Sequence, residues 1–241
     1  MRLRRTPLLV TAVVTTSVLA VAALVDLGVE HTAQQRVVKA AACRLETSGP
    51  VSAELTGTLA GLRVVTGNLG SVHIDAGHVR RYGTDMDIAA DLHDLSTDGT
   101  ISGGTATATI GYDQLQERLA GAQTAAKGMT VGGDGSGLTL TGKVGTLGIP
   151  VTVHTRLSTG ADSLTVTPSS ITVLGQDIAV ARLSTLPGAG NLARQLTPHT
   201  VELPDLPDGV RLVSARPDTK GLTLALDLSR QTAGAAGPKC T

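Results

Sequence analysis

The chain has 241 residues, with twenty basic and twenty acidic side chains and a formal net charge of zero. A chain of this length holds one large domain or two small ones. Without a net charge it has no global field that would attract nucleic acid. It has no Phe or Trp and only two Tyr, so it lacks the aromatic platforms on which single-stranded nucleic acid stacks. We therefore expect no nucleic-acid partner, and an interior built from Leu, Val, Ile and Ala.

The N-terminus has the form of an export segment. Three arginines among the first five residues precede an uncharged apolar stretch from Leu8 to Val25. As a helix this stretch would be roughly 27 Å long, close to the thickness of a bilayer core. Ala20-Val21-Ala22 has the small-x-small form of a cleavage site. Residues 1–25 are therefore predicted to be a signal peptide or a membrane anchor, and both interpretations stay open.

The location of the mature chain follows from the same segment. Arginines on the N-terminal side keep that end in the cytoplasm, so the rest of the chain lies outside the membrane in either case. We expect an extracytoplasmic protein of the cell envelope, either membrane-anchored or secreted. In that compartment disulfides persist, and Cys43 and Cys240 near the ends of the mature region are predicted to pair. Two free thiols are the alternative.

Most of the chain shows the period of two that is typical of β-strands with one apolar face. A helical pattern runs from Asp26 to about Leu45, and the period changes after Gly49-Pro50. The clearest strand has Met86, Ile88, Ala90 and Leu92 on its apolar phase. The same alternation recurs in residues 51–55, 72–76, 106–110, 138–144, 149–153, 164–166 and 222–228. Short connections rich in Gly, Asp and Ser separate these runs and predict antiparallel hairpins.

One helix interrupts the strands. From Tyr112 to Lys127 apolar residues recur at spacings of three and four, and Leu115 and Leu119 lie on the resulting stripe. A large one-faced sheet needs something to cover its apolar side, and this helix supplies an apolar stripe. The predicted fold is α+β and mainly β: a long curved antiparallel sheet wrapped around a helix, preceded by an N-terminal apolar helix. Residues 26–241 are predicted to form one domain.

The elements between Val25 and Leu228 follow a particular order. An N-terminal apolar segment leads into a helix, and the strand near Val51-Ser52-Ala53-Glu54-Leu55 and the strand Met86 to Leu95 follow. The run Gly104 to Ile110 precedes the helix that begins at Tyr112, and the segment Leu203 to Val210 comes late in the chain. In this order of elements the chain resembles the LmeA-like family of actinobacterial phospholipid-binding envelope proteins.

The resemblance implies a tubular lipid-binding fold, in which a curved sheet wraps a helix and leaves an apolar groove for acyl chains. The expected partners are a phospholipid or another acyl lipid, and the membrane through the N-terminal segment. Residues on the apolar phase of their elements are then predicted to line the groove: Ile88, Leu92, Leu115, Leu119, Leu140, Val151, Val153, Leu164 and Val166.

Signatures for other chemistry are weak in this sequence. The six histidines are scattered without metal-ligand spacing, so no metal is predicted. We find no nucleophile elbow and no catalytic cysteine signature, and we expect neither an enzyme nor a cofactor. Aliphatic alternation also occurs in any closed β-core. A membrane-anchored structural or interaction scaffold with a filled core and no ligand is therefore the main alternative, and an enzyme acting on envelope lipids or glycans is a third possibility.

Overall fold

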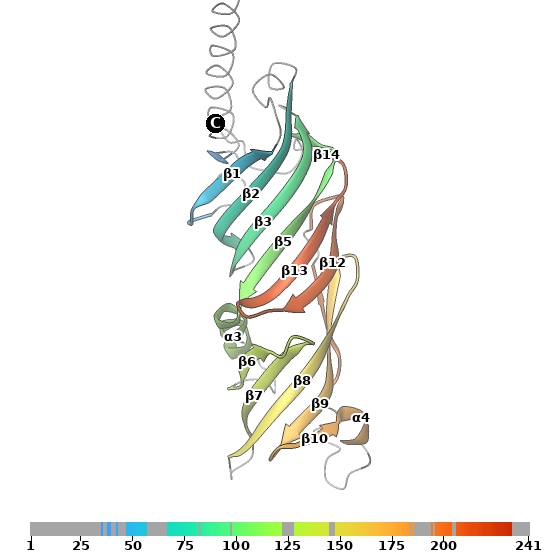
Figure 1. Cartoon of the computed structure of the whole chain (residues 1–241). Helices are drawn as coiled ribbons and strands as arrows, with labels where there is room; N and C mark the ends of the chain where they lie inside the picture. The colour runs from blue at the N-terminus through green and yellow to red at the C-terminus, as the bar shows by residue number, and fades with distance from the viewer. Residues whose placement is uncertain are drawn as a thin grey trace, which may run out of the picture.

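The described part of the chain is dominated by antiparallel β-structure (Figure 1). The computed structural model describes residues 35, 38–39, 42, 47–56, 67–81, 83–96, 98–121, 128–144, 148–183, 185, 194, 196–203 and 206–232. Within these residues every pairing between strands is antiparallel, as the hairpin signals in the sequence predicted.

The first sheet contains six strands in the order β1-β2-β3-β5-β13-β12. Their bounds are β1 Val51–Thr56, β2 Asn68–Arg81, β3 Thr84–Ser96, β5 Gly103–Gly111, β13 Gly221–Leu228 and β12 Val210–Pro217. A separate two-stranded ladder joins β4 (Thr100–Ile101) to β14 (Gln231–Thr232). Because β13 pairs with β5, the end of the chain completes a sheet that its first half begins.

The second sheet is built from the middle of the chain in the order β10-β9-β8-β7-β6. Its strands are β6 Thr130–Gly133, β7 Leu138–Val144, β8 Ile149–Thr159, β9 Ser163–Val173 and β10 Gln176–Ala179. A further strand, β11 (His199–Glu202), pairs with the first part of β9, while β10 pairs with its last part. The short helix α4 (Val180–Leu183) follows β10 and buries Leu183, which is 2% exposed.

The two sheets lie end to end in an elongated molecule (Figure 1). The N–H of Leu212 in β12 donates to the carbonyl of Ala161 at 2.8 Å, and the Thr159 hydroxyl donates to the carbonyl of Val213 at 3.0 Å. These bonds reach the turn between β8 and β9, beside a bulge in β12 between Leu212 and Ser214. Because β12 meets a turn there, the strand ladder does not continue, and two sheets replace the single long sheet predicted from sequence.

Helix α3 (Tyr112–Gly121) follows β5 directly and lies beside the junction of the two sheets (Figure 1). The Gln116 amide donates to the carbonyl of Met129 at 2.6 Å and accepts from the N–H of Val131 at 2.8 Å. These two bonds attach the helix to β6. The predicted helix from Tyr112 to Lys127 is confirmed as far as residue 121, and residues 122–127 lie outside the described part.

Several predictions concern residues outside the described part. The export segment 1–25 and both Cys43 and Cys240 belong to this group, so the anchor and the disulfide stay predictions. Residues 35, 38, 39 and 42 are helical, in line with the helical pattern seen there in the sequence. Among the described helices none is both long and apolar enough to cross a membrane.

The turn between β6 and β7 is closed by the carboxylate of Asp134. It accepts hydrogen bonds from the His154 ring at 2.9 Å, the Ser136 hydroxyl at 2.7 Å and the N–H groups of Ser136 and Gly137, both at 2.9 Å. The bond from His154, followed by that from Ser136, holds the pKa of Asp134 well below its usual range. Since His154 lies on β8, this carboxylate ties the turn to the strand beyond its own hairpin.

This arrangement predicts a contribution to stability that depends on pH. A carboxyl whose pKa is lowered by folding stabilises the native state above its unfolded pKa of about 3.9, and that stability is lost as the pH falls through the folded value. We expect Asp134→Asn to lower the free energy of unfolding by about 1 kcal/mol at neutral pH. The difference from the parent protein should shrink below about pH 4.

Urea unfolding of both proteins at neutral and acid pH measures the effect. Asp208→Asn, at an exposed carboxyl in the turn before β12, is the matched control and should change stability little. An Asp134→Asn variant as stable as the parent at neutral pH would contradict the assigned role of Asp134.

Candidate functional site

One face of the first sheet carries apolar side chains across all six strands. The register of the strands places these side chains in rows. One row contains Val51, Ala76, Ile88, Ala108, Leu224 and Ala215. The next row contains Ala53, Ile74, Ala90, Ala106, Leu226 and Leu212. Because successive residues of a strand point to opposite faces, the Thr and Asp residues between them lie on the other face. We call this surface the apolar face of the first sheet.

A column of small residues runs along β5 in the middle of this face. Gly104, Ala106 and Ala108 occupy successive positions on the apolar phase of β5, and we call them the β5 column. Their partners on β3 are Leu92, Ala90 and Ile88, and their partners on β13 are Leu228, Leu226 and Leu224. The side chains of the β5 column therefore project less far from the sheet than the leucine side chains of β13 beside them.

The glycine at one end of the β5 column is required by its neighbours. A Cβ added at Gly104 would collide with the carbonyl oxygen of Asp91 on β3. Strands β3 and β5 thus approach closely at this point, and a larger side chain there would have to push them apart. Ala106 and Ala108 are 9% and 5% exposed, shielded by the longer side chains around them, whereas Ile88, Ala90, Leu224 and Leu226 are only partly buried.

Many of the buried apolar side chains of the described residues belong to three packed clusters. The β1–β3 cluster consists of Ala53, Leu55, Val72, Leu95 and Ile101, and the helical residue Val38 packs against it. The second-sheet cluster consists of Val151, Val153, Ile171 and Leu183. The junction cluster consists of Leu164, Leu212 and Leu222, with Leu115 of α3 and Leu224 and Leu226 of β13 packed against it.

The predicted lining residues are divided among these clusters. Leu140, Val151 and Val153 belong to the second-sheet cluster, where Val151 and Val153 are only 5% and 4% exposed. Leu115 and Leu164 meet in the junction cluster, and Leu92 packs on the β1–β3 cluster. Ile88 is partly buried on the apolar face of the first sheet, between these groups. Val166 is partly buried on β9 and Leu119 lies within α3.

Sequence analysis named Ile88 and Leu92, the β3 neighbours of the β5 column, but missed the β5 column itself and its neighbours on β13. The leucines of β13 were recognised as a strand, but nothing in one sequence pairs residue 224 with residue 108. The only signal for the β5 column is the composition of the run Gly103 to Ile110, in which small residues alternate with threonines. Such a run predicts a strand with one flat apolar face, and its neighbours follow only from the fold.

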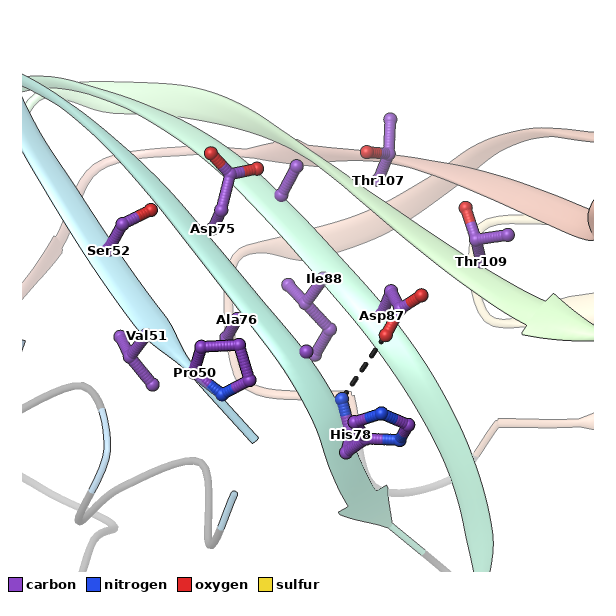
Figure 2. A pocket seen from close by; sticks show the side chains of 12 residues that line it. Pro50, Val51, Ser52, Asp75, Ala76, His78, Asp87, Ile88, Thr107 and Thr109 are labelled. Atoms are coloured by element: carbon purple, nitrogen blue, oxygen red, sulfur yellow. Dashed lines mark hydrogen bonds between the residues drawn. The ribbon is translucent and has the colours of Figure 1, made fainter. Parts of the chain in front are cut away.

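The opposite face of the first sheet carries polar side chains, and an open pocket of about 480 Å³ along β1, β2, β3 and β5 is lined by residues of both faces. Figure 2 shows Ser52 of β1, Asp75 of β2 and Thr107 of β5 lying in one row along it. The Asp87 carboxylate also lines this pocket and accepts a hydrogen bond from the N–H of His78 at 3.2 Å. The pocket thus carries hydroxyl and carboxylate groups beside the apolar side chains of Val51, Ala76 and Ile88.

A histidine on the polar face links two strands. The His73 ring lies 2.6 Å from the Asp91 carboxylate on β3 and 3.1 Å from the Asp75 carboxylate on its own strand. The hydrogen bond to Asp91 is the main reason that the pKa of His73 is raised. This link is therefore strongest below the unfolded pKa of about 6.5 and weakens as the pH rises through the folded value.

These polar groups do not form a metal centre. Among the described residues no group of three or more His, Cys, Asp or Glu side chains is arranged to hold a metal ion.

Comparison with models of protein families identifies the family of the chain. The family model for LmeA-like phospholipid-binding proteins matches residues 24–227. The chain belongs to this family. The matched range contains both sheets, α3 and the whole apolar face of the first sheet up to β13. Comparison with curated proteins and with solved structures gives no match.

The burial of the second-sheet cluster predicts that it has no room for a larger side chain. Val153 lies between Leu140 and Ile171 in the register and is 4% exposed. We expect Val153→Phe to lower the free energy of unfolding by about 1 to 3 kcal/mol through overpacking. Val201→Phe is the control, because Val201 on β11 is 52% exposed.

Denaturant unfolding of the two variants and the parent protein measures the difference. Unchanged stability in Val153→Phe would mean that the second sheet contains free space for a ligand, against the packing described above.

Proposed function

We propose that this protein binds the acyl chains of a phospholipid against the apolar face of its first sheet, along the β5 column. The observation that carries the proposal is the contrast in side-chain size: Gly104, Ala106 and Ala108 form a low strip beside the leucines of β13. Ile88 and Leu226 at the edges of that strip are only partly buried. Membership of a phospholipid-binding family supports this choice of ligand.

The chemistry of the strip fits hydrocarbon. The side chains of the strip are aliphatic and present no hydrogen-bonding group, so the strip itself would not stabilise a phosphate or a sugar. A methylene group transferred from water to such a surface gains about 0.8 kcal/mol. An extended acyl chain lying along β5 would meet one row of side chains after another, and its affinity would grow with the number of rows that it covers.

The proposal extends to the cellular setting of the protein. We propose an extracytoplasmic protein of the cell envelope, anchored by its N-terminal segment or released after cleavage, that serves in envelope lipid or lipoglycan maturation without being an enzyme. We further propose that the sheets curve around α3. In support, Leu115 of α3 packs in the junction cluster, where side chains of both sheets meet.

A scaffold with a filled core remains a second candidate for a specific reason. In the second sheet Val151, Val153, Ile171 and Leu183 are between 2% and 5% exposed, as in a core without a ligand. This packing argues that any lipid is held by the first sheet, and it would extend to the whole protein if the apolar face of the first sheet also proved to be filled.

Replacing two alanines by leucine, one on each face of the first sheet, tests the proposal. Ala108→Leu adds three carbons to the β5 column and should displace about as many methylenes of the lipid, which at ~0.8 kcal/mol each lowers affinity about sixtyfold. Ala89→Leu, on the polar face of β3, should leave lipid binding unchanged.

The measurement is phospholipid extracted from each purified protein and identified by mass spectrometry, together with the midpoint of thermal unfolding. Unchanged lipid content in Ala108→Leu, combined with a lower unfolding temperature, would support the filled scaffold. Loss of lipid in Ala89→Leu but not in Ala108→Leu would indicate that the lipid binds in the pocket lined by Ser52, Asp75 and Ala89.

A further inference from the structure

The turn between β9 and β10 exposes a leucine in a backbone conformation that leucine disfavours. Leu174 is 72% exposed, and its φ is +50°. Gly175 follows with a φ of +80°, and Val173 pairs with Gln176 across the turn. A two-residue hairpin loop with two positive φ angles is a type I′ turn, whose first position favours Asn, Asp or Gly.

Folding does not explain this leucine. A branched, bulky side chain is a genuine outlier at positive φ, whereas His78 and Asp94, the other non-glycine residues with positive φ in the described part, are of types that adopt it more readily. Packing does not explain it either, because most of the Leu174 side chain is in solvent. A mostly exposed apolar residue that strains its turn is a candidate for contact with a partner.

The position of the turn indicates what kind of partner. It lies at the end of the molecule farthest from β1 (Figure 1). Next to it, Val173 and Ile178 are partly buried and pack against the second-sheet cluster, so the apolar interior continues to the turn. Two exposed cations lie on neighbouring elements of the second sheet: Lys143 near the end of β7, opposite Pro150 of β8, and Arg182 on α4, which follows β10. Asp177 on β10 is the nearby acid, and its carboxylate accepts a hydrogen bond from Thr172.

We propose that the Leu174 turn inserts into the surface of a phospholipid bilayer, so that the protein docks on a membrane with this end. An apolar tip with cations beside it matches a surface that has hydrocarbon below and anionic headgroups above. The inference goes beyond acyl-chain binding, because it concerns contact with the bilayer and does not require that the β5 column hold lipid.

The test compares two exposed apolar positions in the full-length protein. The chain is held in nanodiscs, where lipid already surrounds its N-terminal apolar stretch, and is mixed with protein-free vesicles of phosphatidylcholine and phosphatidylglycerol. Leu174→Asn should reduce capture of the vesicles about tenfold, the loss expected when a leucine no longer transfers from water. Val213→Asn, at a position on β12 that is 59% exposed, should leave capture unchanged.

Misfolding would not account for that result. Asn is favoured at the first position of a type I′ turn, so Leu174→Asn should be at least as resistant to urea as the parent protein. Equal capture by Leu174→Asn and the parent protein would overturn the proposal. The proposal would also be overturned if vesicles that carry the protein were captured and protein-free vesicles were not. The turn would then contact a second copy of the chain.

A spectroscopic probe reports the contact directly. The sequence has no Trp, so Leu174→Trp in the full-length chain gives a single tryptophan emission from the turn. Adding the vesicles should shift that emission to shorter wavelength, and brominated lipids should quench it, while Val213→Trp should show neither effect. An unshifted and unquenched Trp at position 174 would overturn the proposal.

The lipid content of the same preparations separates this inference from the proposed function. Leu174→Asn that retains its co-purified phospholipid but fails to dock supports a separate docking role for the turn. A parent protein that docks while carrying no phospholipid would contradict the proposed acyl-chain binding and still support the docking turn.

Discussion

The cross-strand register of the first sheet is the constraint on which the rest of the structure depends. Each strand alternates apolar and polar residues, and the register brings the apolar phases of six strands onto one face. A shift of one residue in any pairing would turn a whole strand over, placing Thr and Asp side chains among the leucines. The register is thus specified by the burial of these apolar side chains. The same register aligns them into a continuous apolar surface.

The two sheets use their apolar faces differently. In the second sheet α4 and the strands close around Val153, Ile171 and Leu183, which leaves these side chains almost fully buried. In the first sheet the apolar face is wider, and several of its side chains remain partly exposed. Because the chain has no Phe or Trp, no large ring fills the low strip along β5. A purely aliphatic composition therefore leaves steps in height on this face, and a flexible hydrocarbon chain can match them.

The polar groups have a different task in this fold. Asp134 fastens the turn of the β6–β7 hairpin to β8, and His73 joins β2 to β3. Both interactions lie on the polar side of their sheets and involve partners from different strands. They hold the strands in register from outside, and leave the apolar faces free of groups that would compete with a lipid.

Strands, the one-faced pattern and α3 could be predicted from the sequence, because alternation and helical spacing are local properties that neighbouring residues display together. The family could be predicted as well, since the resemblance rests on the order of segments along the chain, while the export segment stays a prediction. The division into two sheets could not, because it depends on where the bulge in β12 meets the turn between β8 and β9. Nor could the β5 column, whose neighbours Ile88 and Leu224 come from strands far apart in the chain.

The predicted lining residues shared an apolar phase, yet Val153 lies in a packed cluster while Ile88 lies on a partly exposed face. Phase determines to which side of a strand a residue points, and only the packing of distant elements decides whether that side is filled.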